Sequence, residues 1–214
     1  MCYTQTYISP YIGTSLNSIS NDEVKSRSLF YYELNNEVEN SLLAGLTIQQ
    51  NVLKNINIFF GFDFNRLKIE VDRQRISTES NGVPVDFQER KLERFIHHRY
   101  GFNLGVQYEI LDNLAFSYSH RLVHTPLTIW NELEFMEDKR IQTNLYELAH
   151  QVELSYWIRN VFFSAFFSQG YKKINFAHAE IDPVRSFGLK LGYRFKVLDK
   201  LQRRKKSKVD CPKL

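Results

Sequence analysis

The sequence predicts an all-β fold: an eight-stranded antiparallel up-and-down transmembrane β-barrel with short periplasmic turns and long extracellular loops. Three observations lead to this expectation. Apolar and polar residues alternate with a period of two along most of the chain, as they do in strands that separate two environments. Short and long connections alternate along the chain. No apolar run approaches the roughly 18 residues that a membrane-spanning helix requires.

Eight segments are predicted to be strands. The alternation is clearest in residues 186–197, where Leu189 and Leu191 lie on the opposite face from Lys190. Residues 161–167 are apolar on both faces apart from one serine, so the pattern leaves their orientation open. In chain order, the predicted strands are residues 8–16, 42–49, 56–65, 99–110, 114–122, 146–158, 161–167 and 186–197.

The connections fall into two kinds. Three are short and alike: an apolar pair, a charged residue, Asn, and then a new apolar strand, at residues 52–56, 110–114 and 157–161. Asn tolerates the left-handed backbone that tight hairpins require. The other connections are long and polar, and cover residues 17–41, 70–97, 124–143 and 172–184. This order places both ends of the barrel and the short turns in the periplasm, with the long loops outside.

The residue types on the two faces favour a membrane over water. Large Phe, Tyr, Leu and Ile side chains fill one face, whereas the other mixes small polar residues with charges. An eight-stranded barrel encloses a lumen only wide enough for side chains, so the large rings are expected outside, against lipid. Buried charges must be paired. The expected lumen charge network consists of Asp63, Glu109, Arg121, Glu147, Glu153, Lys190, Arg194 and Lys196.

Two alternatives remain open. The charge network is expected to be structural, although its rearrangement could also gate a narrow path; a wide solute pore is not expected. A soluble, lipocalin-like ligand-binding barrel would show the same alternation with the faces exchanged.

The segment 187–195, Phe-Gly-Leu-Lys-Leu-Gly-Tyr-Arg-Phe, together with the predicted topology, resembles the OmpA-like and OmpX-like eight-stranded outer-membrane barrels. The resemblance covers about residues 3–197. It implies an integral outer-membrane protein with a structural, adhesion or surface-binding role through its loops. The partners that it implies are the lipid bilayer, lipopolysaccharide and the barrel assembly machinery, while the extracellular ligand stays unknown.

No catalytic site is predicted, but two histidines supply an alternative function. His120 and His150 fall on the lipid-facing rows of neighbouring strands, and Ser119 precedes the first of them. Lipid A deacylases resemble this chain in fold and carry a Ser/His site on that surface, which makes an outer-membrane lipid-modifying enzyme the alternative. The His-x-Ser order of those enzymes is not matched. No metal site is predicted, because the histidine spacing fits no closed ligand set, and no cofactor is expected.

Composition and chain ends complete the expectations. The 214 residues fit one barrel domain, residues 1–197, followed by a basic periplasmic tail, residues 198–214. A net charge of +4 is too mild to imply a nucleic-acid partner. Cys2 and Cys211 lie at opposite chain ends and either form a disulfide or remain two free thiols. Lipidation of Cys2 is a third alternative, although the sequence has no lipobox to support it. No secretory signal is visible, so we expect that a signal peptide has been removed from the N-terminus.

Overall fold

The structure is a computed structural model. It describes residues 5–19, 30–35, 39–78, 84–87, 91–132, 138–171, 174–176, 179–181 and 183–197. Among these residues, no helix is long and apolar enough to cross a membrane.

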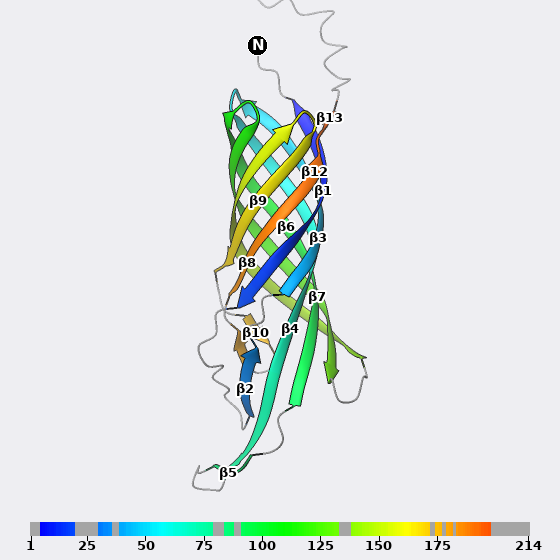
Figure 1. The fold of residues 1–214 in the computed structure, drawn as a ribbon, viewed down its shortest axis with the longest axis vertical. Helices are drawn as coiled ribbons and strands as arrows, with labels where there is room; N and C mark the ends of the chain where they lie inside the picture. Colours follow the sequence, from blue (N-terminus) through cyan, green and yellow to red (C-terminus); the bar gives the residue numbers. More distant parts are fainter. Residues whose placement is uncertain are drawn as a thin grey trace, which may run out of the picture.

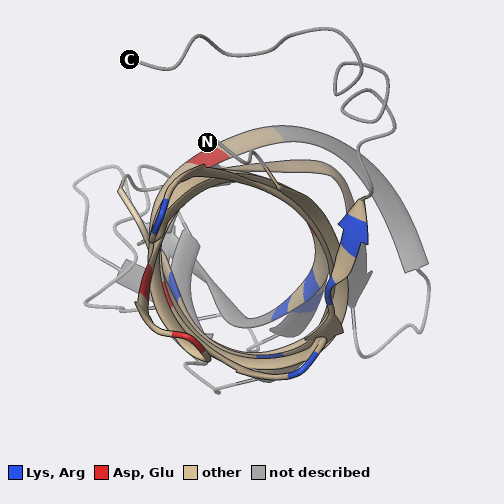
Figure 2. Ribbon diagram, turned by 90° about the horizontal axis from the view of Figure 1, so that it is seen from above, with Lys and Arg blue, Asp and Glu red and all other residues tan. Residues whose placement is uncertain are grey.

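Eight antiparallel strands form a closed ring (Figures 1 and 2). Each of the eight pairs with the next along the chain, and β1 pairs with β12 to close the ring, with Tyr11 opposite Gly192. A short strand, β13 (Phe195–Val197), continues from β12 along β1. This confirms the predicted up-and-down barrel. Its strands are β1 (Thr6–Ile19), β3 (Glu39–Leu53), β4 (Ile56–Thr78), β6 (Lys91–Leu111), β7 (Leu114–Glu132), β8 (Asp138–Ile158), β9 (Val161–Gly170) and β12 (Val184–Tyr193).

The two faces of the barrel have the polarity that the alternation predicts. Leu104 is 62% exposed and Leu189 is 55% exposed on the outer face, whereas Lys190 is only 8% exposed because it points into the lumen. A water-soluble barrel would bury the leucines and expose the lysine. The soluble carrier is therefore the wrong alternative, since an apolar outside around a polar inside suits a barrel surrounded by lipid.

The orientation of β9 is decided by packing inside the lumen. Phe162 and Phe166 point inward, while Phe163 and Phe167 point outward. The neighbouring strand β12 accommodates the inward rings, because a Cβ atom at Gly192 would overlap the Phe162 ring. The glycine therefore leaves the space that the phenyl ring occupies.

The three short turns are built alike, as the sequence predicts. Each turn joins its two strands through two residues. The carbonyl of the turn Asn accepts a backbone hydrogen bond from the chain segment that lies beside the second of these strands. The N–H of Glu109 donates to Asn55, and that of Arg194 donates to Asn160, at 2.9 and 2.7 Å. The expectation that the turn Asn adopts the left-handed backbone conformation is wrong. Among the described non-glycine residues, only Arg159 has a positive φ, 57°.

Two of the predicted long loops are largely strand. β4 continues to Thr78 and β6 begins at Lys91, while β7 continues to Glu132 and β8 begins at Asp138. Figure 1 shows these strands extending past the barrel on the side away from the short turns. In β4 the alternation continues past Asn65 with its phase reversed: Leu67 is buried on the side to which Asp63 and Asn65 point, whereas Arg66 is exposed on the outer face. The outer face of the strand no longer meets lipid there, so apolar residues are not required on it.

Shorter strands complete the fold. β2 (Phe30–Asn35) and β5 (Pro84–Phe87) both pair with the extended part of β4. β10 (Ile174–Phe176) and β11 (Ala179–Ile181) form a separate hairpin between β9 and β12. The basic tail, Cys2 and Cys211 lie outside the described residues.

Candidate functional site

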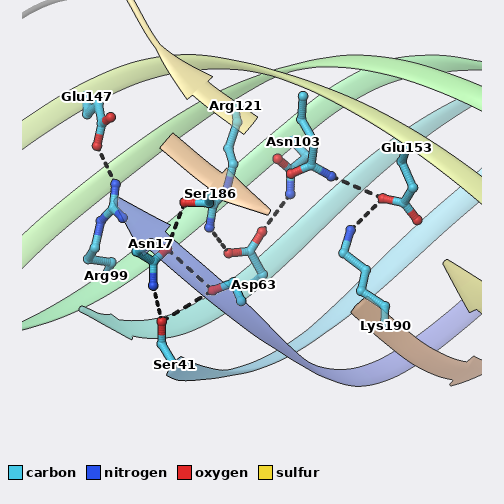
Figure 3. A network of polar contacts seen from close by, with 12 residues as sticks. Asn17, Ser41, Asp63, Arg99, Asn103, Arg121, Glu147, Glu153, Ser186 and Lys190 are labelled. Carbon is cyan, nitrogen blue, oxygen red and sulfur yellow. Dashed lines mark hydrogen bonds and ion pairs between the residues drawn. The ribbon is translucent and has the colours of Figure 1, made fainter. Parts of the chain in front are cut away.

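The lumen contains ion pairs that join strands on either side of a third strand (Figure 3). Asp63 on β4 pairs with Arg121 on β7, across β6. Both side chains are almost completely buried, and Asn103 donates a further hydrogen bond of 2.7 Å from Nδ2 to Asp63 Oδ2. The carboxylate is thus held by two strands at once.

Two further pairs repeat this arrangement. Arg99 on β6 pairs with Glu147 on β8 across β7, and both are buried. Lys190 on β12 reaches Glu153 on β8 across β9, at 2.5 Å from Nζ to Oε2. The Lys190 ammonium also lies 4.9 Å from the centre of the Tyr11 ring. Each pair ties together strands that are not hydrogen-bonded neighbours, so the charges reinforce the barrel wall from the lumen side.

Hydroxyl and amide groups occupy the lumen near the ends of β1 and β12 that lie away from the short turns. Asn17 accepts a hydrogen bond of 2.7 Å from the Ser186 hydroxyl and donates to Ser41. Ser15 lies 3.2 Å from the same Ser41 hydroxyl. These contacts join β1 and β12, the strands that close the barrel, with β3, the other neighbour of β1.

The periplasmic end of the lumen is organised around Arg194. Its guanidinium lies 4.4 Å from the centre of the Trp157 ring and 4.8 Å from that of Tyr7, so it is flanked by two aromatic side chains. It also donates a 3.1 Å hydrogen bond to Gln49, whose amide nitrogen donates to Gln107 at 2.5 Å. The charged side chain of Arg194, held by these contacts, therefore occupies this end of the lumen.

Sequence reasoning places most of these residues on the inner face but cannot pair them. Glu109 accepts a 2.9 Å hydrogen bond from Asn57. Lys196 continues the inward alternation of Lys190 and Arg194, but it is exposed. Its expected place in the buried network is wrong, because it lies in β13 at the end of the barrel wall.

Arg99 is the member of the ion pairs that the predicted network lacks. It stands two positions before Gly101 and four before Asn103, on the same inward alternation. Continuing the inward alternation of β6 by one more position toward the N-terminus would have found it. A buried arginine is also what Glu147 needs, because an unpaired carboxylate would be very costly at that position.

The two histidines on the outer face do not lie beside the serine that precedes the first of them in the sequence. His120 and His150 are directly opposite each other on β7 and β8. Ser119 points the other way and is only 2% exposed, so the barrel wall separates it from His120. Among the described residues, no group of three or more His, Cys, Asp and Glu side chains could hold a metal ion. The geometry gives no support to a Ser/His reaction at this surface.

The extended strands form an open sheet beyond the barrel. Past Asn65, β4 no longer pairs with β3 and pairs with β2 on that side. On the other side, β8 pairs with β9 only from Ala149 onward, although it pairs with β7 from Asp138. We call the sheet formed by β2 and the outer parts of β4, β6, β7 and β8 the protruding sheet. Within the described residues, its outermost strands, β2 and the start of β8, each pair on one side only.

Comparison with known proteins identifies the architecture. No protein-family model and no curated protein sequence matches the chain. Among solved structures, Ail of Yersinia pestis in complex with the heparin analogue sucrose octasulfate matches with a TM-score of 0.51 and 14% identity, over 89% of this chain and 99% of that chain. A second structure of Ail matches with a TM-score of 0.50 and 15% identity, over 88% and 98% of the two chains.

Neisserial surface protein A is also similar, with a TM-score of 0.48 and 15% identity, over 90% of this chain and 97% of that chain. At such identities the likeness to Ail concerns the fold alone. The membrane assignment rests in addition on the apolar outer face and the charged lumen of the chain itself. The chain therefore has the fold of the small eight-stranded β-barrels of the Gram-negative outer membrane.

Proposed function

We propose that this outer-membrane barrel has a surface-binding or adhesion role, exercised by the protruding sheet, and that it does not serve as a wide solute pore. The observation that carries the proposal is the continuation of β4, β6, β7 and β8 beyond the part of the chain that the membrane requires. A membrane strand needs only about 9–11 residues, whereas β4 has 23 and β6 has 21.

The lumen supports the second half of the proposal. The buried pairs Asp63–Arg121 and Arg99–Glu147 lie in the interior, each reaching over one strand of the wall, and the guanidinium of Arg194 occupies its periplasmic end. Separating a buried ion pair leaves an uncompensated charge, at a cost of about 3–5 kcal/mol. A solute path through this interior would have to break such pairs.

The protruding sheet supports the first half. The outermost strands of an open sheet present backbone N–H and C=O groups that another chain or a polar ligand can use. Binding through these backbone groups requires no special side chain. Ail was solved with a heparin analogue, so a sulfated polysaccharide is a suitable first probe for this chain too.

The bilayer environment is part of the same proposal. Lipopolysaccharide would surround the outer half of the barrel, and the barrel assembly machinery would insert it. A lipid-modifying activity is not proposed, because Ser119 and His120 lie on opposite sides of the barrel wall.

A trimmed variant tests the binding role. Glu70 pairs with Arg94 and Thr128 with Ile141, so residues 71–93 and 129–140 can each be replaced by an Asn-Gly turn. The trimmed barrel should refold and keep its heat-modifiable gel migration. It should bind immobilised heparin or cultured cells at least about tenfold less well than the full chain, a difference of about 1.4 kcal/mol.

Each trimmed hairpin tested alone serves as a control and shows which part of the sheet binds. Equal binding by the full chain and the doubly trimmed variant would overturn the proposed role of the sheet. Large, steady conductance of the full chain in a planar lipid bilayer would overturn the statement that the lumen is not a wide pore.

A further inference from the structure

A row of polar side chains crosses the lipid-facing surface on four adjacent strands. Arg185 on β12 is directly opposite Gln169 on β9, Gln169 is opposite His150 on β8, and His150 is opposite His120 on β7. We call these four residues the polar row. Residues directly opposite on one face of a sheet have Cβ atoms only about 4.5–5.5 Å apart. The polar row is therefore continuous.

On its side nearer the short turns, the polar row borders an apolar surface. One step nearer those turns, the side chains on the same four strands are Phe187, Phe167, Val152 and Tyr118. These side chains are exposed or half-buried on the outer face. The carboxylates of the same region, Glu147 and Glu153, belong to the inward alternation and are held in lumen ion pairs. The polar row thus carries hydrogen-bond donors and a cation, without a negative charge.

The histidines of the row are held in place by Tyr171, which follows the end of β9. Its hydroxyl lies 3.0 Å from His120 Nδ1. Its ring lies 5.1 Å from the His150 ring and 6.2 Å from the His120 ring, and Tyr118 meets His120 edge-on at 5.3 Å. The imidazoles are therefore fixed against the barrel wall, with one nitrogen of His120 already engaged.

The depth of the row points to a lipid as its partner. Arg185 and Gln169 lie next to the outer ends of β12 and β9, whereas His120 lies well inside β7. The row therefore slopes from the outer rim toward the hydrocarbon. A cation on the lipid face costs up to about 2–4 kcal/mol at the midplane and far less near the interface. An anionic group at the top of the row would offset that cost for Arg185.

We propose that the polar row binds the phosphate group of an outer-leaflet lipid. Arg185 supplies the charge-assisted hydrogen bonds, Gln169 and His150 supply further donors, and the acyl chains lie over Phe187, Phe167 and Val152. A lipid suits this site better than a soluble anion because apolar side chains border it toward the membrane. The inference rests on the proposed outer-membrane setting, but it does not depend on the protruding sheet.

Native mass spectrometry of the full chain in detergent micelles tests the proposal. The three probes are lipid A, whose phosphate groups carry a net negative charge, phosphatidylcholine, whose phosphate charge is balanced by its choline group, and inorganic phosphate alone. The wild-type barrel should retain lipid A in preference to the other two. Arg185→Ala should weaken lipid A binding about tenfold, as expected for the loss of a charge-assisted contact. His150→Ala should weaken it less, and Arg185→Lys should restore part of the loss.

Arg66→Ala is the matched control, because Arg66 is also exposed on the outer face but lies on β4, away from the polar row. It should bind lipid A like the wild type, and all variants should keep heat-modifiable migration. The proposal is overturned if Arg185→Ala binds lipid A as the wild type does, or if phosphatidylcholine or inorganic phosphate binds equally well. The trimmed variant should still bind lipid A, and Arg185→Ala should still bind heparin, so the two proposals fail separately.

Discussion

Asp63 and Arg121 form a buried ion pair that passes directly over Gly101, on the strand between them. A Cβ atom at Gly101 would lie 2.6 Å from Asp63 Oδ1 and 2.7 Å from Arg121 Nε. The pair can close only because β6 carries a residue without a side chain at this position. One glycine thus determines whether β4 and β7 can be joined through the lumen.

Gly101→Ala should therefore destabilise the barrel. The added methyl group must push the two charged side chains apart or shift the wall, an effect of about 1–3 kcal/mol for overpacking in a filled interior. Urea unfolding of the refolded protein in micelles measures it. Gly61→Ala is the matched control, because a Cβ there would come no closer than 3.4 Å to its neighbours. Equal effects of the two substitutions would contradict this account.

Arg121→Met alone should lower the free energy of unfolding more than the double substitution that replaces both Asp63 and Arg121. The single substitution leaves Asp63 buried without its counter-charge, at about 3–5 kcal/mol, whereas Asp63→Leu with Arg121→Met removes both charges and is often nearly neutral. The measurement is a double-mutant cycle of unfolding free energies. If the double variant is as unstable as the sum of the two single variants, Asp63 and Arg121 do not stabilise each other.

Trp157→Leu should loosen the periplasmic end of the lumen. The substitution removes one of the two rings that flank Arg194, a contribution of about 1–2 kcal/mol for a cation partly withdrawn from water. The shift in the urea midpoint provides the measurement. Tyr156→Leu is the control on the same strand, since Tyr156 is exposed on the outer face. A larger shift for Tyr156→Leu would contradict the role assigned to Trp157.

His97 should make the protruding part of β6 sensitive to acid. His97 is buried, and its Nδ1 atom lies 2.8 Å from the Thr128 hydroxyl. Burial, aided by the charges of Arg99 and His98, lowers the pKa of His97 to about 3. The unfolded chain, with a His pKa of about 6.5, binds more protons between these values. Stability should therefore fall as the pH drops from about 6.5 toward about 3.

His97→Gln should flatten that dependence, because glutamine does not titrate and can still face Thr128. Hydrogen exchange of the β6 backbone amides, followed across this pH range in both proteins, isolates the contribution of His97 from carboxylates that titrate in both. An unchanged slope in His97→Gln would show that protonation of this side chain does not limit stability.

Several features can be predicted because they depend only on local order along the chain. The period of two is a property of every strand, so it separates Leu189 from Lys190 whatever the neighbouring strands are. The three Asn-containing turns repeat a local pattern and lie where the sequence predicts them. The extension of β4 escapes prediction because its apolar residues change faces after Asn65: Leu67 takes an inner position, so the row of apolar residues on the outer face, which marks a membrane strand, ends there.

The sequence by itself determined the strand order, the closed barrel, and the inward direction of charged residues such as Asp63, Arg121 and Lys190, but it did not identify the inward Arg99. Only the tertiary structure decided the partners: Arg99 with Glu147, Lys190 with Glu153, and the orientation of Phe162 and Phe166 toward glycines on β12. The physical reason is the range of the forces involved. Alternation arises within one strand, whereas pairing across the lumen depends on the relative register of strands that are not neighbours in the chain.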